Sequence, residues 1–157
     1  FILLRGPTSC TIWIPSAGVD LFRGAFFVCT SLASVTIPDG VQTIGWGAFF
    51  NCTPLVNVTI PGSVKTIGGY AFGGTSLASV TIPRGVKSIG KGAFYECTSL
   101  ASAVIPRSVT HIDGYAFTKC SPNLKIQYDG TKAQWNAISG DKPKTTIRCS
   151  DGDVVIK

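Results

Sequence analysis

The sequence predicts a β-rich solenoid with little helix, in which about five coils stack on one parallel sheet and a C-terminal cap follows. Three observations predict this fold. Ile-Pro returns at residues 14, 37, 60, 82 and 105, which are steps of 22 or 23 residues. Ala-Phe returns in the same rhythm at residues 25, 48, 71, 93 and 116. Apolar and polar residues alternate before each Ile-Pro, as in a half-buried strand. Repeats at such a period are typical of solenoids.

Each coil opens with a short strand. In the segment 32–37, Val35 and Ile37 face one side of the strand while Ser34 and Thr36 face the other. We expect the proline that follows to end the strand, because it has no N–H group to donate to the next strand. The equivalent strands begin at Leu55, Leu77 and Leu100.

The second half of each coil supplies the rest of the core. In one coil the apolar residues Val41 and Ile44 are followed by a glycine-rich bend and then by Ala48 and Phe49. We expect the phenylalanine to enter the core and the alanine to let the neighbouring coil approach closely. One coil cannot bury these residues alone, whereas stacked coils can. The bend is too short and too rich in glycine for more than a single turn of helix.

The repeat ends after Leu124, and a different pattern follows. Lys125–Tyr128 is predicted to form a last strand. Thr131 is a good N-cap for a short helix over Lys132–Ile138, and Gln134 stands at the position that completes a capping box. Further strands are predicted over residues 145–149 and 154–156, around an Asp-Gly turn.

The last segment is expected to cap the solenoid. Trp135 and Ile138 fall on one side of the short helix, where they would plug the open end of the core. An uncapped solenoid exposes a strand edge, which invites aggregation. The chain therefore divides into a solenoid over residues 1–128, whose first coil is irregular, and a capping segment over residues 129–157. A ligand-binding role for Trp135 is the alternative.

The six cysteines leave two interpretations open. Four of them stand three residues after the repeated phenylalanine, at Cys29, Cys52, Cys97 and Cys120. Adjacent coils would bring their Cα atoms to about 5 Å, which is within disulfide range. In-register side chains point the same way, however, so the torsion is awkward and a ladder of free, buried thiols is favoured. Cys10 and Cys149, near opposite ends of the chain, are also expected to be free.

No motif predicts catalysis, and we expect no enzymatic activity, no metal and no cofactor. His111 is the only histidine and stands in an outward slot without a positioned partner. There is no C-x-x-C pair for zinc and no phosphate or dinucleotide loop. The net charge of +6 comes without a dense basic run, so nucleic acid is not an expected partner. The longest uncharged stretch, residues 40–64, is broken by Asn and Pro and does not predict a membrane helix.

The unit L-x-x-V-x-I-P-x-x-V-x-x-I-G-x-x-A-F-x-x-C resembles the 23-residue leucine-rich repeat of BspA-like bacterial surface proteins, over about residues 8–128. The resemblance implies a leucine-rich-repeat solenoid in an extracellular or cell-surface setting. It implies a protein-interaction module that adheres to host or matrix proteins, or to another surface protein. We expect a monomer without membrane insertion. Because the sequence begins at Phe1, we expect any signal peptide of the parent protein to lie outside this chain.

The outward ladders of the repeat form the predicted binding face, which is flat and polar and becomes basic toward the C-terminus. Its candidate residues are Trp13, Thr36, Asn57, Thr59 and Thr81 on the strands, with Arg84 and Arg107 in the loops after Ile-Pro. Extended faces of this kind suit protein binding. The alternative is a structural spacer without a ligand of its own, since few exposed aromatic residues are expected to mark a binding hot spot.

Overall fold

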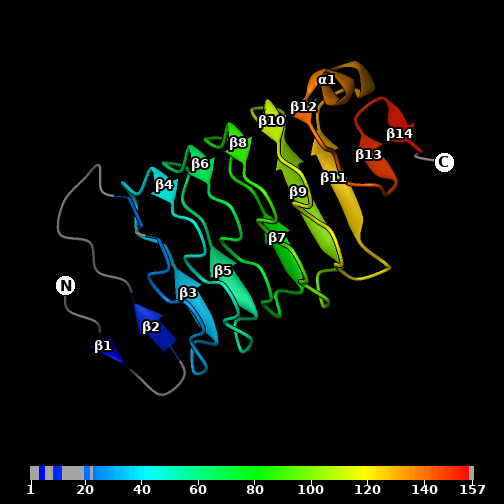
Figure 1. Ribbon diagram of the computed structural model, residues 1–157. Coiled ribbons are helices and arrows are strands. Elements are labelled where there is room, and N and C mark those ends of the chain that lie inside the picture. The colour runs from blue at the N-terminus through cyan, green and yellow to red at the C-terminus, as the bar shows by residue number, and fades with distance from the viewer. Residues whose placement is uncertain (1–3, 6–8, 12–19, 22, 156–157) are drawn as a thin grey trace.

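The computed structural model describes residues 4, 5, 9–11, 20, 21 and 23–155. The coils stack in chain order, so the colour in Figure 1 changes steadily along the long axis of the molecule. Each regular coil contributes short strands to two sides of the stack, and the apolar side chains between these sides are buried. The predicted fold class, a β-rich solenoid of about five coils with little helix, is confirmed, but the coils stack on parallel sheets along two sides rather than on one parallel sheet.

Two parallel ladders follow each other along the first side of the stack. Sheet A has the order β1-β2-β3-β5 and sheet C the order β14-β13-β11-β9-β7. Their repeat strands are β2 (Ser9–Thr11), β3 (Ser34–Thr36), β5 (Asn57–Thr59), β7 (Ser79–Thr81), β9 (Ser102–Pro106) and β11 (Lys125–Asp129). The strands β3, β5, β7 and β9 are shorter than the predicted six-residue segments, whereas β11 extends one residue beyond the predicted Lys125–Tyr128. Only β9 runs through its proline, so Ile-Pro lies beyond the strand in the preceding coils. β1 (Leu4–Arg5) pairs antiparallel with β2.

A second parallel sheet lies along the other side, where the sequence analysis expected apolar positions without naming a strand. Sheet B has the order β12-β10-β8-β6-β4. Its strands are β4 (Thr43–Ile44), β6 (Thr66–Ile67), β8 (Ser88–Ile89), β10 (His111–Ile112) and β12 (Ser139–Gly140). In the first four, the isoleucine is buried and the polar residue before it is partly exposed. Each strand can be as short as two residues, because its backbone groups form hydrogen bonds with the equivalent strands of the neighbouring coils.

The ladder on the first side is interrupted between β5 and β7, which belong to different sheets. The interruption coincides with a deletion in the repeat. Leu77 follows Phe72 by five residues, whereas Leu55 follows Phe49 by six. The missing residue falls directly before β7, so this strand starts from a shorter turn than its neighbours. Sheet B continues past the same coil, since β6 and β8 pair in register.

The core is organised around a ladder of phenylalanine rings. Phe26, Phe49, Phe72, Phe94 and Phe117 stack in chain order, with ring centroids 5.1–5.5 Å apart and ring planes within 13° of parallel. The alanines that precede the three middle rings, at residues 48, 71 and 93, have no exposed surface. Both predictions for the Ala-Phe pair are therefore confirmed in these coils. Each ring buries its faces against the coils above and below, which no coil achieves alone.

The C-terminal segment contains α1 (Lys132–Ala137), which is the one helix in the part of the chain that the structure describes. Thr131 is its N-cap, and Thr131 and Gln134 form the predicted capping box. Trp135 is only 1% exposed, and its ring meets Tyr128 edge-on at 5.2 Å. The predicted hairpin is present as β13 (Ile147–Cys149) and β14 (Gly152–Val154), although both strands are shorter or displaced relative to the prediction. Among the described residues, no helix is long and apolar enough to cross a membrane.

Candidate interaction surfaces

The polar face predicted from the sequence is exposed. Thr36 and Thr59 stand opposite each other in register on β3 and β5, and Asn57 lies beside them on β5. Thr81 is also exposed, but it stands on β7 in the other sheet, beyond the interruption. The structure thus places three of these residues in one sheet and the fourth on the first strand of the next sheet along the same side. Trp13 lies outside the described residues.

The two candidate arginines lie in the loops at the ends of the sheet C strands. Both Arg84 and Arg107 are exposed. The Nη2 atom of Arg84 lies 3.4 Å from Oδ2 of Asp129, at the end of β11. An exposed pair of this kind contributes little to stability, so Arg84 remains available to a partner.

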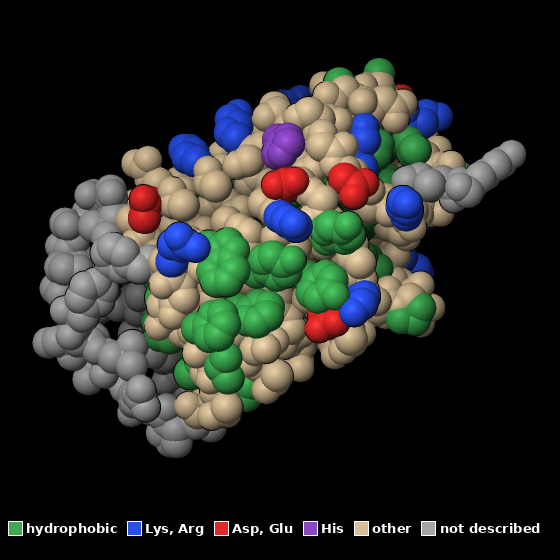
Figure 2. All heavy atoms as spheres, viewed as in Figure 1, with side chains coloured by type: hydrophobic (Ala, Val, Ile, Leu, Met, Phe, Trp, Pro, Cys, Tyr) green, Lys and Arg blue, Asp and Glu red, His purple; other side chains and the backbone are tan. Residues whose placement is uncertain are grey.

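A second surface was missed in the sequence. Six aromatic residues lie on the segments that connect sheet B to the next strand of the first side, and we call them the aromatic surface. They are Phe27, Trp46, Phe50, Tyr70, Tyr95 and Tyr115. Phe27 is 48% exposed, Trp46 43% and Tyr115 54%. Figure 2 shows hydrophobic side chains gathered on this face. The expectation that few aromatic residues are exposed is therefore wrong.

The aromatic surface is continuous across coils. Phe27 stacks on Phe50 at 5.2 Å, Phe50 meets Tyr70 edge-on at 5.9 Å, and Tyr70 meets Tyr95 at 5.9 Å. Trp46 also contacts Tyr70, at 6.0 Å. Such pairs hold each ring in place before any partner arrives. A sequence signal existed, because these residues stand immediately before Ala-Phe, one position earlier, or immediately after it. These positions were not recognised as aromatic, because glycine occupies some of them in other coils.

Two of the tyrosines occupy backbone positions that disfavour side chains. The residue before Ala-Phe is left-handed in every described coil, with φ between 53° and 62°. Three coils place glycine there, whereas the other two place Tyr70 and Tyr115. A bulky residue with positive φ is strained, and the cost is about 1–2 kcal/mol. The fold itself accepts glycine at this position, so the tyrosines are not needed to form the turn.

Cations lie over three rings of the aromatic surface. Arg23 Cζ is 5.4 Å from the centroid of Trp46, Lys119 Nζ is 5.2 Å from that of Tyr95, and Lys91 Nζ is 5.7 Å from that of Tyr115. Cation–π contacts of this type are favourable even at exposed sites. The surface is therefore aromatic and positively charged together.

Lys119 has a second partner. Its Nζ donates to Oε1 of Glu96 at 2.8 Å. This hydrogen bond lowers the pKa of the Glu96 carboxyl and raises the pKa of Lys119. Both side chains are exposed, so solvent weakens the pair and it serves mainly to orient Lys119 over Tyr95.

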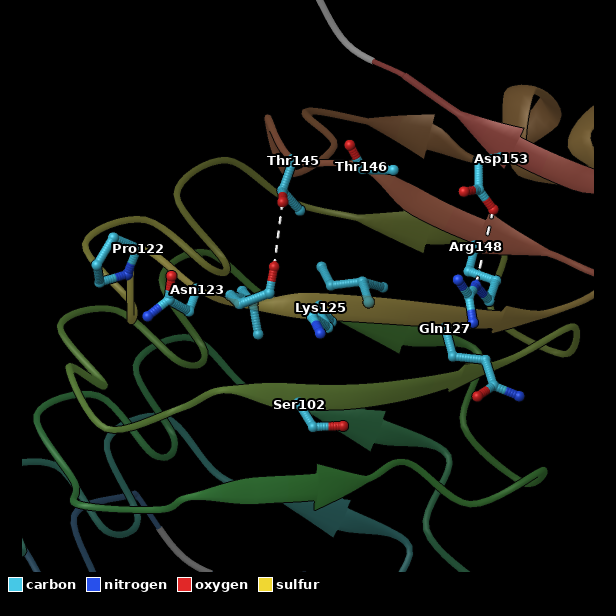
Figure 3. A pocket seen from close by; sticks show the side chains of 11 residues that line it. Ser102, Pro122, Asn123, Lys125, Gln127, Thr145, Thr146, Arg148 and Asp153 are labelled. Atoms are coloured by element: carbon cyan, nitrogen blue, oxygen red, sulfur yellow. Dashed lines mark hydrogen bonds and ion pairs between the residues drawn. The ribbon is translucent and has the colours of Figure 1, made fainter.

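Two open pockets lie near the C-terminal end. The larger, of about 650 Å³, is lined by polar and apolar residues of β9, of β11 with the segment before it, and of the segment 145–153. Figure 3 shows Ser102, Lys125 and Gln127 on its floor and the pair Arg148–Asp153 at its edge, 3.8 Å apart. It contains no nucleophile beside a base, and nothing in it is arranged for proton transfer.

The smaller pocket, of about 400 Å³, adjoins the aromatic surface through Tyr115. We call it the lysine pocket, because Lys119, Lys142 and Lys144 line it together with Asp141. Nζ of Lys142 donates to the carbonyl oxygens of residues 135, 136 and 138 at 3.0–3.3 Å, at the end of α1. This lysine is thus fixed in position by the backbone of the helix.

His111 has a partner that the sequence did not reveal. Its Nδ1 lies 2.8 Å from Oγ of Ser139, across the pairing of β10 with β12. Oγ of Ser139 donates to the carbonyl oxygen of Thr110 at 3.1 Å. The hydroxyl of Ser139 thus has the backbone carbonyl oxygen of Thr110 as an acceptor, besides its contact with the His111 ring. The pair joins two strands of sheet B.

The cysteines form a hydrogen-bonded ladder rather than a reactive site. The described thiols of residues 29, 52, 97, 120 and 149 are free. Sγ of Cys52 donates to the carbonyl oxygen of Phe26 at 2.9 Å, and Sγ of Cys97 donates to that of Phe72 at 3.1 Å. Burial raises the pKa of Cys52 to about 11 and that of Cys120 to about 12. Thiols protonated at neutral pH are poor nucleophiles. Within the described part of the chain, no group of three or more His, Cys, Asp or Glu side chains is placed to hold a metal.

Known proteins share this repeat. Residues 19–137 match the BspA type leucine rich repeat region in six copies. A leucine rich cell surface protein from Faecalibacterium prausnitzii A2-165 is 38% identical with a TM-score of 0.79, over 88% of this chain and 36% of that chain. The leucine-rich repeat protein of T. pallidum is 36% identical with a TM-score of 0.67, over 69% of this chain and 51% of that one. A search of curated proteins finds no match.

The pneumococcal vaccine antigen PcpA shares the fold alone, with 18% identity and a TM-score of 0.57 over 86% of this chain and 38% of that one. This chain spans only 36% and 51% of the two closer structures just described. The family match instead covers most of this chain, and its repeats are those that stack the phenylalanine ladder and both sides of the solenoid. The chain belongs to the BspA-type leucine-rich repeat family.

Proposed function

We propose that this chain is a non-enzymatic protein-interaction module of a secreted or cell-surface bacterial protein, and that it adheres to host or matrix proteins or to another surface protein. Leucine-rich repeat solenoids offer extended surfaces for binding proteins. The relative from Faecalibacterium prausnitzii is a cell surface protein, which supports the same setting here. We further propose that the module acts as a monomer.

The observation that carries the proposal is the aromatic surface. Phe27 and Trp46 are almost half exposed, and their rings continue into those of the next coils. Contiguous apolar surface of this kind marks interaction sites in folded proteins. Tyr, Trp and Arg are also the residues enriched at binding hot spots. A spacer would gain nothing from strained tyrosines at positions where other coils place glycine.

The polar face remains a second candidate binding surface. Thr36, Asn57 and Thr59 form a flat patch on sheet A, with Thr81 on the adjoining strand of sheet C. Its alternative role is that of a solvated outer face in a structural spacer. The two surfaces can be tested separately, because their residues lie on different segments of each coil.

We also propose that residues 1–128 form the repeat domain and that residues 129–157 cap it. The burial of Trp135 and its contact with Tyr128 support this division. The hairpin of β13 and β14 supports it as well, since an antiparallel strand ends the parallel stacking of sheet C.

The test is a binding assay on intact host cells and immobilised extracellular-matrix proteins. The variant Trp46→Ala/Tyr70→Gly removes two central rings, and Thr59→Lys/Thr81→Lys alters the polar face as its matched control. We expect saturable binding by the wild type, loss of binding in the aromatic variant and retention in the control. Loss only in the control would move the site to the polar face. The absence of saturable binding in all three proteins would support the spacer instead.

A further inference from the structure

We propose that the aromatic surface and the lysine pocket together bind an extended acidic segment of a partner protein, whose apolar side chains lie on the rings and one of whose carboxylates enters the pocket. This inference rests on the proposed function and adds the chemistry of the partner. It assigns the lysine pocket a role in binding.

The two features share one residue and therefore form one continuous site. Tyr115 lines the lysine pocket, and Lys91 of the preceding coil lies over its ring. Lys119, whose Nζ lies over Tyr95, also lines the pocket. A chain that follows the rings toward the C-terminus thus arrives at the pocket.

The pocket is arranged to receive a carboxylate. Three lysines line it against one aspartate, Asp141. Lys142 donates to three helix carbonyl oxygens, which uses its three N–H groups, so it adds positive charge to the pocket while Lys144 is placed to donate to a carboxylate. Among the described residues, neither Lys142 nor Lys144 forms an ion pair with a carboxylate. A partner carboxylate would supply the missing countercharge.

The charge around the rings is positive on balance, since Arg23, Lys91 and Lys119 lie over rings and Glu96 is paired with one of them. Arg23 and Lys91 lie over rings at the two ends of the aromatic surface, and neither pairs with a carboxylate within the described part of the chain. Figure 2 shows Lys and Arg side chains at the border of the hydrophobic group, with some Asp and Glu side chains among them. Glu96 is already engaged by Lys119. The complementary partner is therefore acidic as well as apolar.

The spacing of the coils suits an extended chain. The rings from Phe27 to Tyr115 come from five successive coils, which span about 19 Å at a strand spacing of about 4.8 Å. An extended chain of about six residues covers the same length.

The test begins with selection of binders from a library of displayed random 12-residue peptides on the wild-type chain, with counter-selection on Trp46→Ala/Tyr70→Gly. We expect enrichment of peptides that combine Asp or Glu with apolar residues. Enrichment of basic or uncharged peptides overturns the inference, and so does the absence of any enrichment. A glycan array is probed in parallel, and saturable binding of a glycan that requires Trp46 also overturns it.

The enriched peptide is then titrated against charge variants. Lys91→Glu/Lys144→Glu is expected to weaken binding about tenfold or more, while Lys91→Arg/Lys144→Arg retains it. The matched control is Lys65→Glu/Lys87→Glu, at exposed lysines outside both features. Added salt should weaken wild-type binding and should affect the Glu variant less. Equal binding by the Glu variant refutes the acidic partner. If the Glu variant binds like the wild type but the aromatic variant loses binding, only the acidic character of the partner is refuted. The proposed protein-interaction function then stands.

Discussion

Thr75 Oγ1 lies 3.4 Å from Sγ of Cys97, in the slot that cysteine occupies in neighbouring coils. Both side chains bond to the same acceptor, because Thr75 donates to the carbonyl oxygen of Phe72 at 2.8 Å and Cys97 donates to it at 3.1 Å. Thr75 is the one polar or charged residue classed as buried among the described residues. The hydroxyl of Thr75 thus fills the cysteine slot but donates to the carbonyl oxygen of its own coil, whereas the cysteines donate to that of the preceding coil.

The first prediction concerns this substitution within the ladder. Thr75→Val keeps the shape but removes the hydroxyl, and we expect it to lower the free energy of unfolding by about 1 kcal/mol. Thr75→Cys restores the side chain of the other coils and should cost less. Denaturant unfolding of both variants measures the difference. Equal destabilisation by the two would show that the hydrogen bond in this slot is unimportant.

The second prediction concerns the reactivity of the thiols. Cys52 and Cys97 are buried and hydrogen-bonded, so we expect a thiol reagent at neutral pH to modify them slowly in the folded protein. After unfolding, all six cysteines of the chain should react at once. Counting the modified thiols by mass spectrometry before and after unfolding provides the measurement. Fewer than six reactive thiols in the unfolded protein would indicate a disulfide.

The third prediction concerns alkaline pH. Burial raises the pKa of Cys52 from about 9 to about 11, so the folded state holds a proton that the unfolded state releases. The resulting stability is fully present below about pH 9 and is lost as pH rises from 9 to 11. The free energy of unfolding should therefore fall across this window. Cys52→Ala should show a shallower fall than the wild type, and an identical slope would contradict the assignment.

The fourth prediction concerns two turn positions in neighbouring coils. A Cβ atom at Gly92 would lie 2.7 Å from Cε1 of Tyr70, and φ at Gly92 is 61°. Gly92→Ala should therefore destabilise the fold by about 1–3 kcal/mol. Tyr70→Gly removes both the strain at residue 70 and its ring contacts, so we expect a net change within about 1 kcal/mol.

A double-mutant cycle tests this coupling. In the Tyr70→Gly background the steric part of the Gly92→Ala cost should disappear, while the part due to the left-handed backbone remains. Unfolding of the four proteins gives the interaction energy. Strict additivity would mean that the ring of Tyr70 moves aside freely and is not held for binding.

The fifth prediction concerns the C-terminal segment. Trp135 is nearly fully buried, and Trp135→Ala should lower the free energy of unfolding by about 3–5 kcal/mol. If residues 129–157 form a cap, the variant should also aggregate, because it uncovers the end of the core. Asn136→Ala, at an exposed position of the same helix, is the control. Unfolding and light scattering would measure both effects, and an unchanged midpoint would argue against the cap.

The core and the short helix were predictable because each depends on local pattern. Phe49 recurs with the period of the coil, so its ladder follows from the repeat alone. Thr131 and Gln134 have the spacing of a capping box, and the helix begins there. Sheet B was not foreseen as a sheet, because two residues such as Thr66 and Ile67 carry too little alternation to indicate a strand.

The aromatic surface was hidden for a different reason. Phe27 stacks on Phe50 from the same repeat position, whereas Trp46 contacts Tyr70 in the next coil from a different one. An irregular series of aromatic residues in the sequence thus becomes a patch only when the coils are stacked. The pairing of His111 with Ser139 arises in the same way, since Ser139 lies beyond the last regular repeat.

The sequence by itself determined the period of the coil, its inward residues and the family, because each follows from residues that recur at fixed spacing. Only the tertiary structure decided where Tyr115 and the lysines around it meet, how Thr75 completes the cysteine ladder and which face combines rings with positive charge. Stacking brings residues about 23 positions apart in the chain into contact. Which side chains then touch depends on their orientation and size, and the order of residues in the chain does not reveal it.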